Sequence, residues 1–221
     1  MVIITSQRAY EILDGLASDP DLGRFVDHSL PIPKVFCGTG YIKLVILGQD
    51  PTVKNEASRK RIKTVLNLDK NNSLRRYLVE VCDGLGLDLD ENVYATNYFK
   101  NFFIKPPTQI DDIDVFSTYS PYWLPLLKEE IAEFHRVPVI TLGEPLLGAV
   151  VGQNASPKVR DYWGYTNDWK EGATKPYGFL AQDKNALERE VFPFPHQPSI
   201  QKQYYRERLG RYIDFVKPYL S

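Results

Sequence analysis

The stretch Lys43-Leu44-Val45-Ile46-Leu47-Gly48-Gln49-Asp50-Pro51 decides the fold class. Its short apolar run is typical of a parallel strand that is buried on both faces, and the run ends abruptly in Gly-Gln-Asp-Pro. In open α/β sheets, ligands bind outside the carboxyl ends of the strands. Asp50 therefore lies at a position where catalytic residues are commonly found in such sheets.

Three further apolar segments predict the remaining strands of the sheet, and segments with helical spacing lie between them. Strands that alternate with helices are typical of a parallel sheet covered by helices. We therefore expect a three-layer α/β/α fold with a central four-stranded parallel sheet. The four expected strands are residues 42–47, 92–97, 137–143 and 189–194.

The spacing of apolar residues also predicts the helices. Asn72-Ser73 is expected to cap a helix that Gly84 and Gly86 end. A long basic and aromatic segment, residues 200–219, closes the chain. Further helices are expected within residues 6–25, 59–68, 121–134 and 144–151.

The composition indicates one ordinary globular domain. A chain of 221 residues with 43% hydrophobic residues can bury one sizeable core, so we expect a single domain over residues 1–221. The net charge of −1 provides no global basic field, and a DNA partner would need a local basic face.

Cysteine content and hydropathy limit the cellular compartments and the cofactors that are compatible with this chain. Cys37 and Cys82 are too few for a disulfide framework, or for a four-cysteine zinc or iron–sulfur site. The apolar start, residues 1–6, is too short for a signal peptide, and no window is long enough for a membrane span. We therefore expect a cytoplasmic protein with no membrane association. We also expect a monomer with no metal and no organic cofactor.

Three polar residues at the ends of predicted strands are candidates for chemistry. Asp50 lies in a Gly-x-Asp-Pro turn, where an aspartate can equally serve the turn alone. Asn97 can read the edge of a base, or it can satisfy local backbone groups. His196, one of three histidines, can stabilise a developing oxyanion or act as a structural loop residue.

Two basic clusters offer contacts to phosphates. Cations of this kind bind phosphates and interleaved tyrosines stack on bases, although a solvated helix face has the same pattern. One cluster is Arg59-Lys60-Arg61 with Lys63, and the other consists of Lys202, Arg206, Arg208 and Arg211 around Tyr204 and Tyr205.

The order of these parts resembles the uracil-DNA glycosylase superfamily over roughly residues 43–211. Gly48-Gln49-Asp50-Pro51 matches the water-activating loop of family 1. Thr96-Asn97, followed by Lys100 and Pro106-Pro107, is similar to the uracil-reading strand of the thermophilic family. Thr141-Leu142-Gly143-Glu144 looks like the third strand and its turn. His196-Gln197-Pro198-Ser199-Ile200 resembles the His-Pro-Ser-Pro-Leu loop, with one additional residue.

The resemblance implies a role for each matching position. Asp50 would activate the attacking water and stabilise an oxocarbenium-like sugar. The backbone amide of Gln49 would approach O2 of a flipped base, and Asn97 would read its Watson–Crick edge. His196 would stabilise negative charge on O2 of the departing base. DNA would be held by Ser199 on a phosphate, by Ile200 as an apolar wedge in the stack, and by Lys202, Arg206 and Arg208.

Some positions depart from the family pattern. Thr52 stands where family 1 has the tyrosine that excludes the thymine methyl group, and residues 53–68 contain no phenylalanine to stack on uracil. Gln197 is inserted between His196 and Pro198. These departures indicate a divergent branch.

The resemblance implies hydrolysis of the N-glycosidic bond of uracil, or of a related damaged base, in DNA. A first alternative is a catalytically weakened protein of the same fold that binds DNA or a partner. A second is an unrelated α/β enzyme acting on a free nucleotide or small phosphorylated substrate, for which the chain shows none of the standard glycine-rich phosphate loops.

Overall fold

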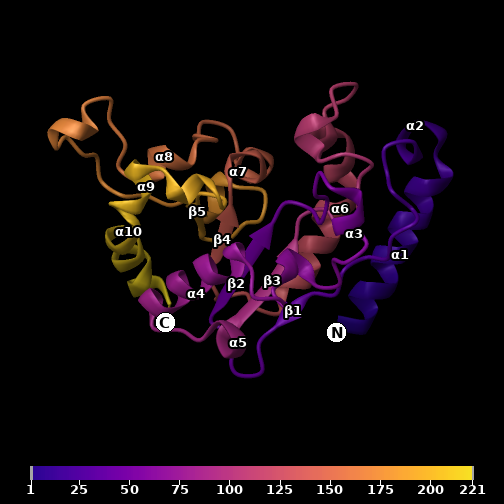
Figure 1. Ribbon diagram of the computed structural model, residues 1–221, viewed down its shortest axis with the longest axis horizontal. Helices are drawn as coiled ribbons and strands as arrows, with labels where there is room; N and C mark the ends of the chain where they lie inside the picture. The colour runs from indigo at the N-terminus through magenta and orange to yellow at the C-terminus, as the bar shows by residue number, and fades with distance from the viewer. Residues whose placement is uncertain (1, 221) are drawn as a thin grey trace.

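The computed structural model describes the backbone of residues 2–220 and the side chains of residues 7–220. A five-stranded sheet runs through the centre of the molecule in the order β1-β3-β2-β4-β5 (Figure 1). Its strands are β1 (Phe36–Cys37), β2 (Leu44–Gly48), β3 (Val93–Asn97), β4 (Val139–Leu142) and β5 (Val191–Phe194).

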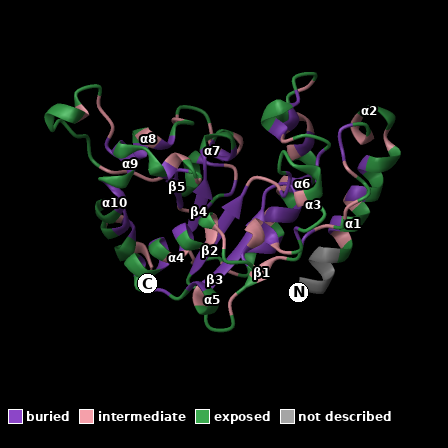
Figure 2. Cartoon of the chain, viewed as in Figure 1, coloured by how far each residue is buried: buried purple, intermediate pink, exposed green. Residues whose placement is uncertain are grey.

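Strands β2 to β5 are mutually parallel and correspond to the four strands predicted from the sequence. Every residue of these four strands is buried, as expected for a parallel sheet covered on both faces (Figure 2). The two-residue strand β1 is antiparallel to β3 and was not predicted. The α/β class is therefore confirmed, with one additional edge strand.

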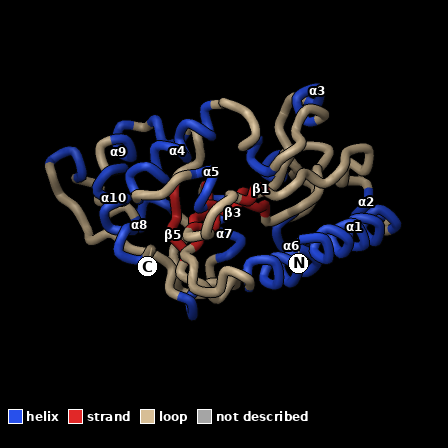
Figure 3. Tube along the Cα trace, turned by 90° about the horizontal axis from the view of Figure 1, so that it is seen from below, coloured by secondary structure: helices blue, strands red, loops and turns tan. Residues whose placement is uncertain are grey.

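Helices cover both faces of the sheet. Figure 3 shows α4 (Ser73–Leu85) and α6 (Val115–Ala132) on opposite sides of the strands. Helix α10 (Leu209–Val216) packs against α4, and α1 (Val2–Ser18) packs against α6. The result is the three-layer arrangement that alternating strands and helices predict.

Local sequence signals explain where the main helices begin and end. The side chain of Asn72 accepts a hydrogen bond from the backbone N–H of Arg75 at 2.8 Å, and Gly86 closes α4 in the left-handed conformation with φ 76°. Helix α6 starts at Val115, capped by Asp114, and contains Pro121. The prediction that this helix starts at residue 121 was therefore wrong, because proline also fits a helix whose N-terminal cap lies further upstream.

Residues 59–68, predicted as a helix, are mostly irregular. Helix α3 (Glu56–Arg59) ends at the start of this segment, which then pairs in extended form through a bridge between Lys34 and Thr64. Leu66 and Asn67 have positive φ values of 56° and 53°, which lie outside the right-handed α-helical region. The segment therefore forms a strap across the ends of the strands rather than a helix.

The remaining short elements connect this frame. The stretch around Trp163 packs onto β5, where the indole N–H of Trp163 donates to the Pro193 carbonyl oxygen at 2.7 Å. None of the helices within residues 2–220 has the length and the apolar composition that a membrane-spanning helix requires.

The other helices are α2 (Pro20–Gly23), α5 (Leu89–Asn92), α7 (Glu144–Val150), α8 (Val159–Tyr162), α9 (Gln203–Arg206), and the 3-10 turns η1 (Val65–Asn67), η2 (Pro107–Gln109), η3 (Trp169–Glu171), η4 (Gln182–Lys184), η5 (Ser199–Gln201) and η6 (Lys217–Tyr219).

Candidate functional site

A cavity of about 520 Å³ opens at the carboxyl ends of the parallel strands, and we call it the Asp50 cavity. Asp50 enters it from the loop after β2, and Gly143 borders it at the end of β4. His196 lines the same cavity from the loop after β5. The fold thus brings together two of the predicted site residues that are far apart in the sequence.

Two hydrogen bonds orient the carboxylate of Asp50. Its Oδ1 accepts from the side-chain amide of Gln49, and its Oδ2 accepts from the backbone N–H of Thr52, both at 2.8 Å. Desolvation raises the pKa of Asp50 to about 6, against the opposing effects of these hydrogen bonds and of the Arg59 charge. A carboxylate that exchanges its proton near neutral pH and keeps free lone pairs is suited to general-base chemistry.

The loop that carries Asp50 is fixed to the segment after β3. The hydroxyl of Thr52 accepts from the backbone N–H of Phe103 at 2.8 Å. The guanidinium of Arg59 donates to the carbonyl oxygens of Val53 at 2.6 Å and Ile104 at 2.8 Å. Arg59 is buried, so it is a positioning residue rather than a member of an exposed basic cluster as the sequence predicted.

His196 is exposed at the rim of the Asp50 cavity. Gly143 approaches it closely, since a Cβ atom at position 143 would lie 3.1 Å from the His196 Cβ, and the positive φ of 95° there also favours glycine. Desolvation lowers the pKa of His196, against the opposing effect of a backbone hydrogen bond with Gln197. The imidazole is therefore neutral at pH 7 and can donate through one ring nitrogen.

Gln49 lines the Asp50 cavity, whereas Asn97 does not. Asn97 pairs with Gly48 in the sheet and is buried, and its Oδ1 has no hydrogen-bond partner among the described residues. Leu66 from η1 lies over Gly48 beside the Asn97 oxygen and lines the Asp50 cavity. Sequence reasoning missed Leu66, because its left-handed backbone places it there and leucine rarely adopts that conformation.

The residues expected to hold DNA differ in their accessibility. Ser199 and Lys202 line a hollow of about 190 Å³ that also contains His196, so they lie next to the Asp50 cavity. Arg206 is exposed and forms an ion pair with Glu80 at 3.1 Å. Arg206 can exchange Glu80 for another anionic partner at low energetic cost, because exposed ion pairs contribute little to stability.

Two of the expected DNA contacts require correction. Ile200 is fully buried, so it cannot serve as an exposed wedge in this structure. Arg208 is also buried, with its guanidinium 4.3 Å from the Tyr204 ring centre and 5.3 Å from that of Trp169. Aromatic rings thus enclose the Arg208 side chain. The alternation of basic and aromatic residues in the sequence had instead indicated an exposed face.

Among residues 7–220, no group of three or more His, Cys, Asp or Glu side chains is arranged to hold a metal ion. The chain matches no protein-family model and no curated protein sequence.

Proposed function

We propose that this chain is a DNA glycosylase that hydrolyses the N-glycosidic bond of uracil, or of a related damaged base, in DNA. The observation that carries the proposal is that Asp50 and His196 line one cavity at the carboxyl ends of β2 and β5. They stand in two loops that resemble signature motifs of the uracil-DNA glycosylase superfamily, the second with Gln197 inserted. The Asp50 carboxylate is oriented by Gln49 and Thr52.

In the proposed reaction, the bond between C1′ of the sugar and the base breaks, and its electron pair leaves with the base. The ionised Asp50 stabilises the positive charge that develops on the sugar and accepts a proton from the water that attacks C1′. The neutral imidazole of His196 donates a hydrogen bond to the oxygen on which the base anion carries its charge. Solvent then returns a proton to the released base.

The proposed DNA contacts are Ser199 and Lys202, because both lie beside His196. A flipped nucleotide in the Asp50 cavity would leave its neighbouring phosphate within reach of this rim. Arg206 is a further candidate, since it is exposed on α9. Arg208 is left out because its charge is enclosed by aromatic rings.

One observation favours the second candidate function, a protein of this fold that binds DNA without excising a base. Asn97, proposed to read the base, does not line the Asp50 cavity, and Leu66 lies over Gly48 next to it. A base in the Asp50 cavity would need the strap around Leu66 to shift before it could reach the Asn97 amide. A protein in which the strap never moves would bind DNA and release nothing.

The experiment that separates the two candidates measures base release from oligonucleotides with a single uracil, either single-stranded or paired with G or A. Alkali cleaves the strand at each abasic site, and DNA binding is measured in parallel by fluorescence anisotropy. The glycosylase proposal expects strand cleavage. Bound DNA that stays intact with uracil and with other damaged bases would favour the binding protein instead.

A further inference from the structure

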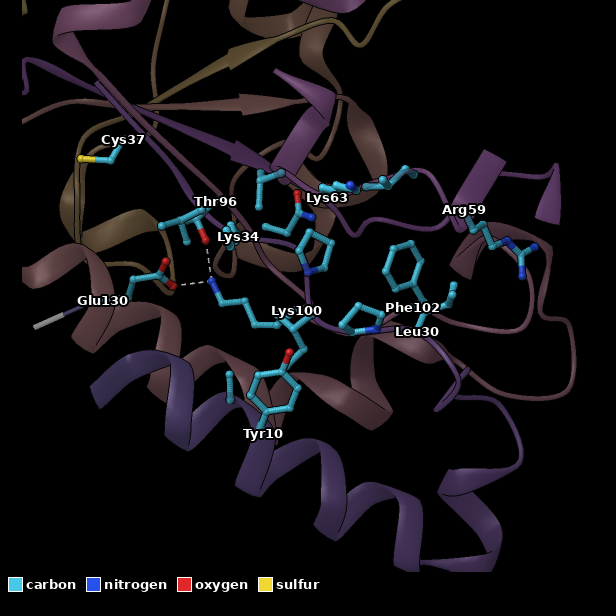
Figure 4. Close-up of a pocket in the computed structure, with 18 of the residues that line it drawn as sticks. Tyr10, Leu30, Lys34, Cys37, Arg59, Lys63, Thr96, Lys100, Phe102 and Glu130 are labelled. Atoms are coloured by element: carbon cyan, nitrogen blue, oxygen red, sulfur yellow. Dashed lines mark hydrogen bonds and ion pairs between the residues drawn. The ribbon is translucent and has the colours of Figure 1, made fainter. Parts of the chain in front are cut away.

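A second and larger cavity, of about 830 Å³, lies between α1, β3 and α6, and we call it the Lys100 cavity (Figure 4). Residues 30–35 and the strap after α3 complete its walls. Its volume falls within the range of pockets that bind small molecules and cofactors. Neither Asp50 nor His196 lines it.

The floor of the Lys100 cavity is a buried polar network. The ammonium group of Lys100 forms an ion pair with Glu130 and donates to the hydroxyl of Thr96 at 2.6 Å, as the dashed lines in Figure 4 show. The hydroxyl of Tyr94 donates to the other Glu130 oxygen at 2.6 Å. All four side chains are at least nine-tenths buried.

This network leaves hydrogen-bond donors available at the floor. An ammonium group has three N–H donors, and the described residues provide two acceptors for that of Lys100. The hydroxyl of Thr96 accepts from Lys100, so its own proton can also be donated. Because the charges of Lys100 and Glu130 cancel, the floor suits a neutral acceptor such as a ring carbonyl oxygen.

The exposed part of the Lys100 cavity lining, which we call its mouth, carries positive charge. Lys34 and Lys63 both line it and are exposed, and the backbone N–H of Lys34 donates to the Lys63 carbonyl oxygen at 2.9 Å. Neither lysine forms an ion pair with any described residue, so the pair lacks a neutralising anion.

The walls between floor and mouth are largely apolar. Leu30, Ile32, Val35 and the ring of Phe102 contribute to them. Tyr10, on α1, adds a second aromatic ring, which is 42% exposed (Figure 4). A planar apolar ring would pack against such walls, whereas a phosphate or carboxylate placed deep among them would be costly to desolvate.

We infer that the Lys100 cavity binds a nucleoside monophosphate whose base carries a ring carbonyl. The carbonyl oxygen accepts from Lys100 and Thr96 at the floor, the ring packs against the apolar walls, and the phosphate lies between Lys34 and Lys63. A fatty acyl anion would also suit the mouth and the walls, but its tail would cover the polar floor without making a hydrogen bond, which is unfavourable.

The test is isothermal titration calorimetry with uridine 5′-monophosphate and three partial ligands: uridine, ribose 5-phosphate and decanoate. Each partial ligand removes or replaces one part of the inferred match. We expect saturable binding of uridine 5′-monophosphate, about tenfold weaker binding of uridine because the charge-assisted contacts are lost, and no measurable binding of the other two.

Variants locate the site of binding. The double variant Lys34→Ala/Lys63→Ala should weaken uridine 5′-monophosphate binding about tenfold or more, whereas the exposed pair Lys170→Ala/Lys175→Ala should leave it unchanged. Asp50→Asn should also leave it unchanged, because Asp50 lines the other cavity. This result would hold whether or not the chain excises bases.

Four outcomes would overturn the inference. They are the absence of saturable binding of uridine 5′-monophosphate, binding that Lys34→Ala/Lys63→Ala leaves intact, tighter binding of decanoate than of the nucleotide, and loss of binding in Asp50→Asn. A single-stranded oligonucleotide that binds through Lys34 and Lys63 when the mononucleotide does not bind would assign the cationic mouth to DNA instead.

Discussion

The side-chain oxygen of Asn97 lies against the Cα of Gly48, so that a Cβ atom at position 48 would come within 2.4 Å of it. The same Cβ would lie 2.6 Å from the Cδ2 atom of Leu66. Gly48 is thus the point where β2, β3 and the strap after α3 meet, immediately before the loop of Asp50. Its lack of a side chain allows all three to approach.

Replacing Gly48 by alanine is expected to destabilise the protein. Asn97 and Leu66 would both have to move, which costs about 1–3 kcal/mol of unfolding free energy in a well-packed core. Urea unfolding followed by circular dichroism measures this cost. Gly15→Ala is the matched control, because a Cβ at this helical position meets nothing within 4 Å and should slightly stabilise α1. Equal stability of Gly48→Ala and wild type would contradict the packing described.

Asp50 is expected to make stability fall as pH rises. Its pKa in the folded state is raised to about 6, above the ordinary value of 3.8, so the folded state binds more protons between these pH values. The stability that Asp50 contributes is fully present below about pH 4 and is lost as pH rises through 6. Because the side chain is half-buried, the loss is about 1–3 kcal/mol.

Asp50→Asn removes this titration. Relative to wild type, the variant should gain unfolding free energy between pH 4 and pH 7, as measured by urea unfolding at each pH. Asp83→Asn, at an exposed aspartate near the end of α4, should show no such gain. Parallel stability profiles for Asp50→Asn and wild type would mean that the folded state leaves the pKa of Asp50 near its ordinary value.

His196→Asn is expected to slow base release while leaving the fold unchanged. The imidazole is exposed, so its removal disturbs little packing, but the shorter amide of asparagine does not reach the base oxygen to which the imidazole would donate. A loss of about 10²–10³-fold in the single-turnover rate is typical for one such donor. His135→Asn changes another exposed histidine and should retain the full rate. A rate that is unaffected by His196→Asn would remove this residue from the proposed mechanism.

Breaking the buried pair under the Lys100 cavity is expected to be costly. Desolvation lowers the pKa of Lys100, an effect that Glu130 opposes. Glu130→Ala would leave the ammonium unpaired and cost about 3–5 kcal/mol of unfolding free energy. Glu80→Ala, which breaks the exposed pair with Arg206, should cost about 1 kcal/mol or less.

The double variant Lys100→Met/Glu130→Leu completes this test. It removes both charges together and should recover much of the stability that Glu130→Ala loses, because no unpaired charge remains buried. Chemical denaturation of the double variant and of its two single changes, Lys100→Met and Glu130→Leu, alongside Glu130→Ala provides the comparison. If the double variant were as unstable as the sum of its single changes, the two side chains would not interact as a pair.

The frame of the sheet could be predicted from the sequence because buried parallel strands have continuous apolar runs. This signal identified all four parallel strands, and Asn72 and Gly86 gave the bounds of α4. The edge strand β1 has two residues, too few for any periodicity. The start of α6 was predicted too late, because the prediction made Pro121 the first helical residue. In the structure the helix is capped at Asp114, and Pro121 lies inside it.

The site was only partly predictable, because burial depends on contacts between distant segments. Asp50 and His196 follow strands directly, so the sheet places them at one edge. The burial of Ile200 and Arg208, by contrast, depends on a core of aromatic residues from several segments. The Lys100 cavity was not predicted, since its walls come from α1, β3, α6 and two loops.

The most direct test of the central proposal is mass spectrometric detection of free uracil after a single turnover on uracil-containing DNA. The proposal predicts that wild type and Asp83→Asn release the base, and that Asp50→Asn binds the same DNA but is slower by about 10²–10⁴-fold. Release of uracil at equal rates by Asp50→Asn and wild type would contradict the role of Asp50. No release by wild type from any uracil substrate would contradict excision of uracil.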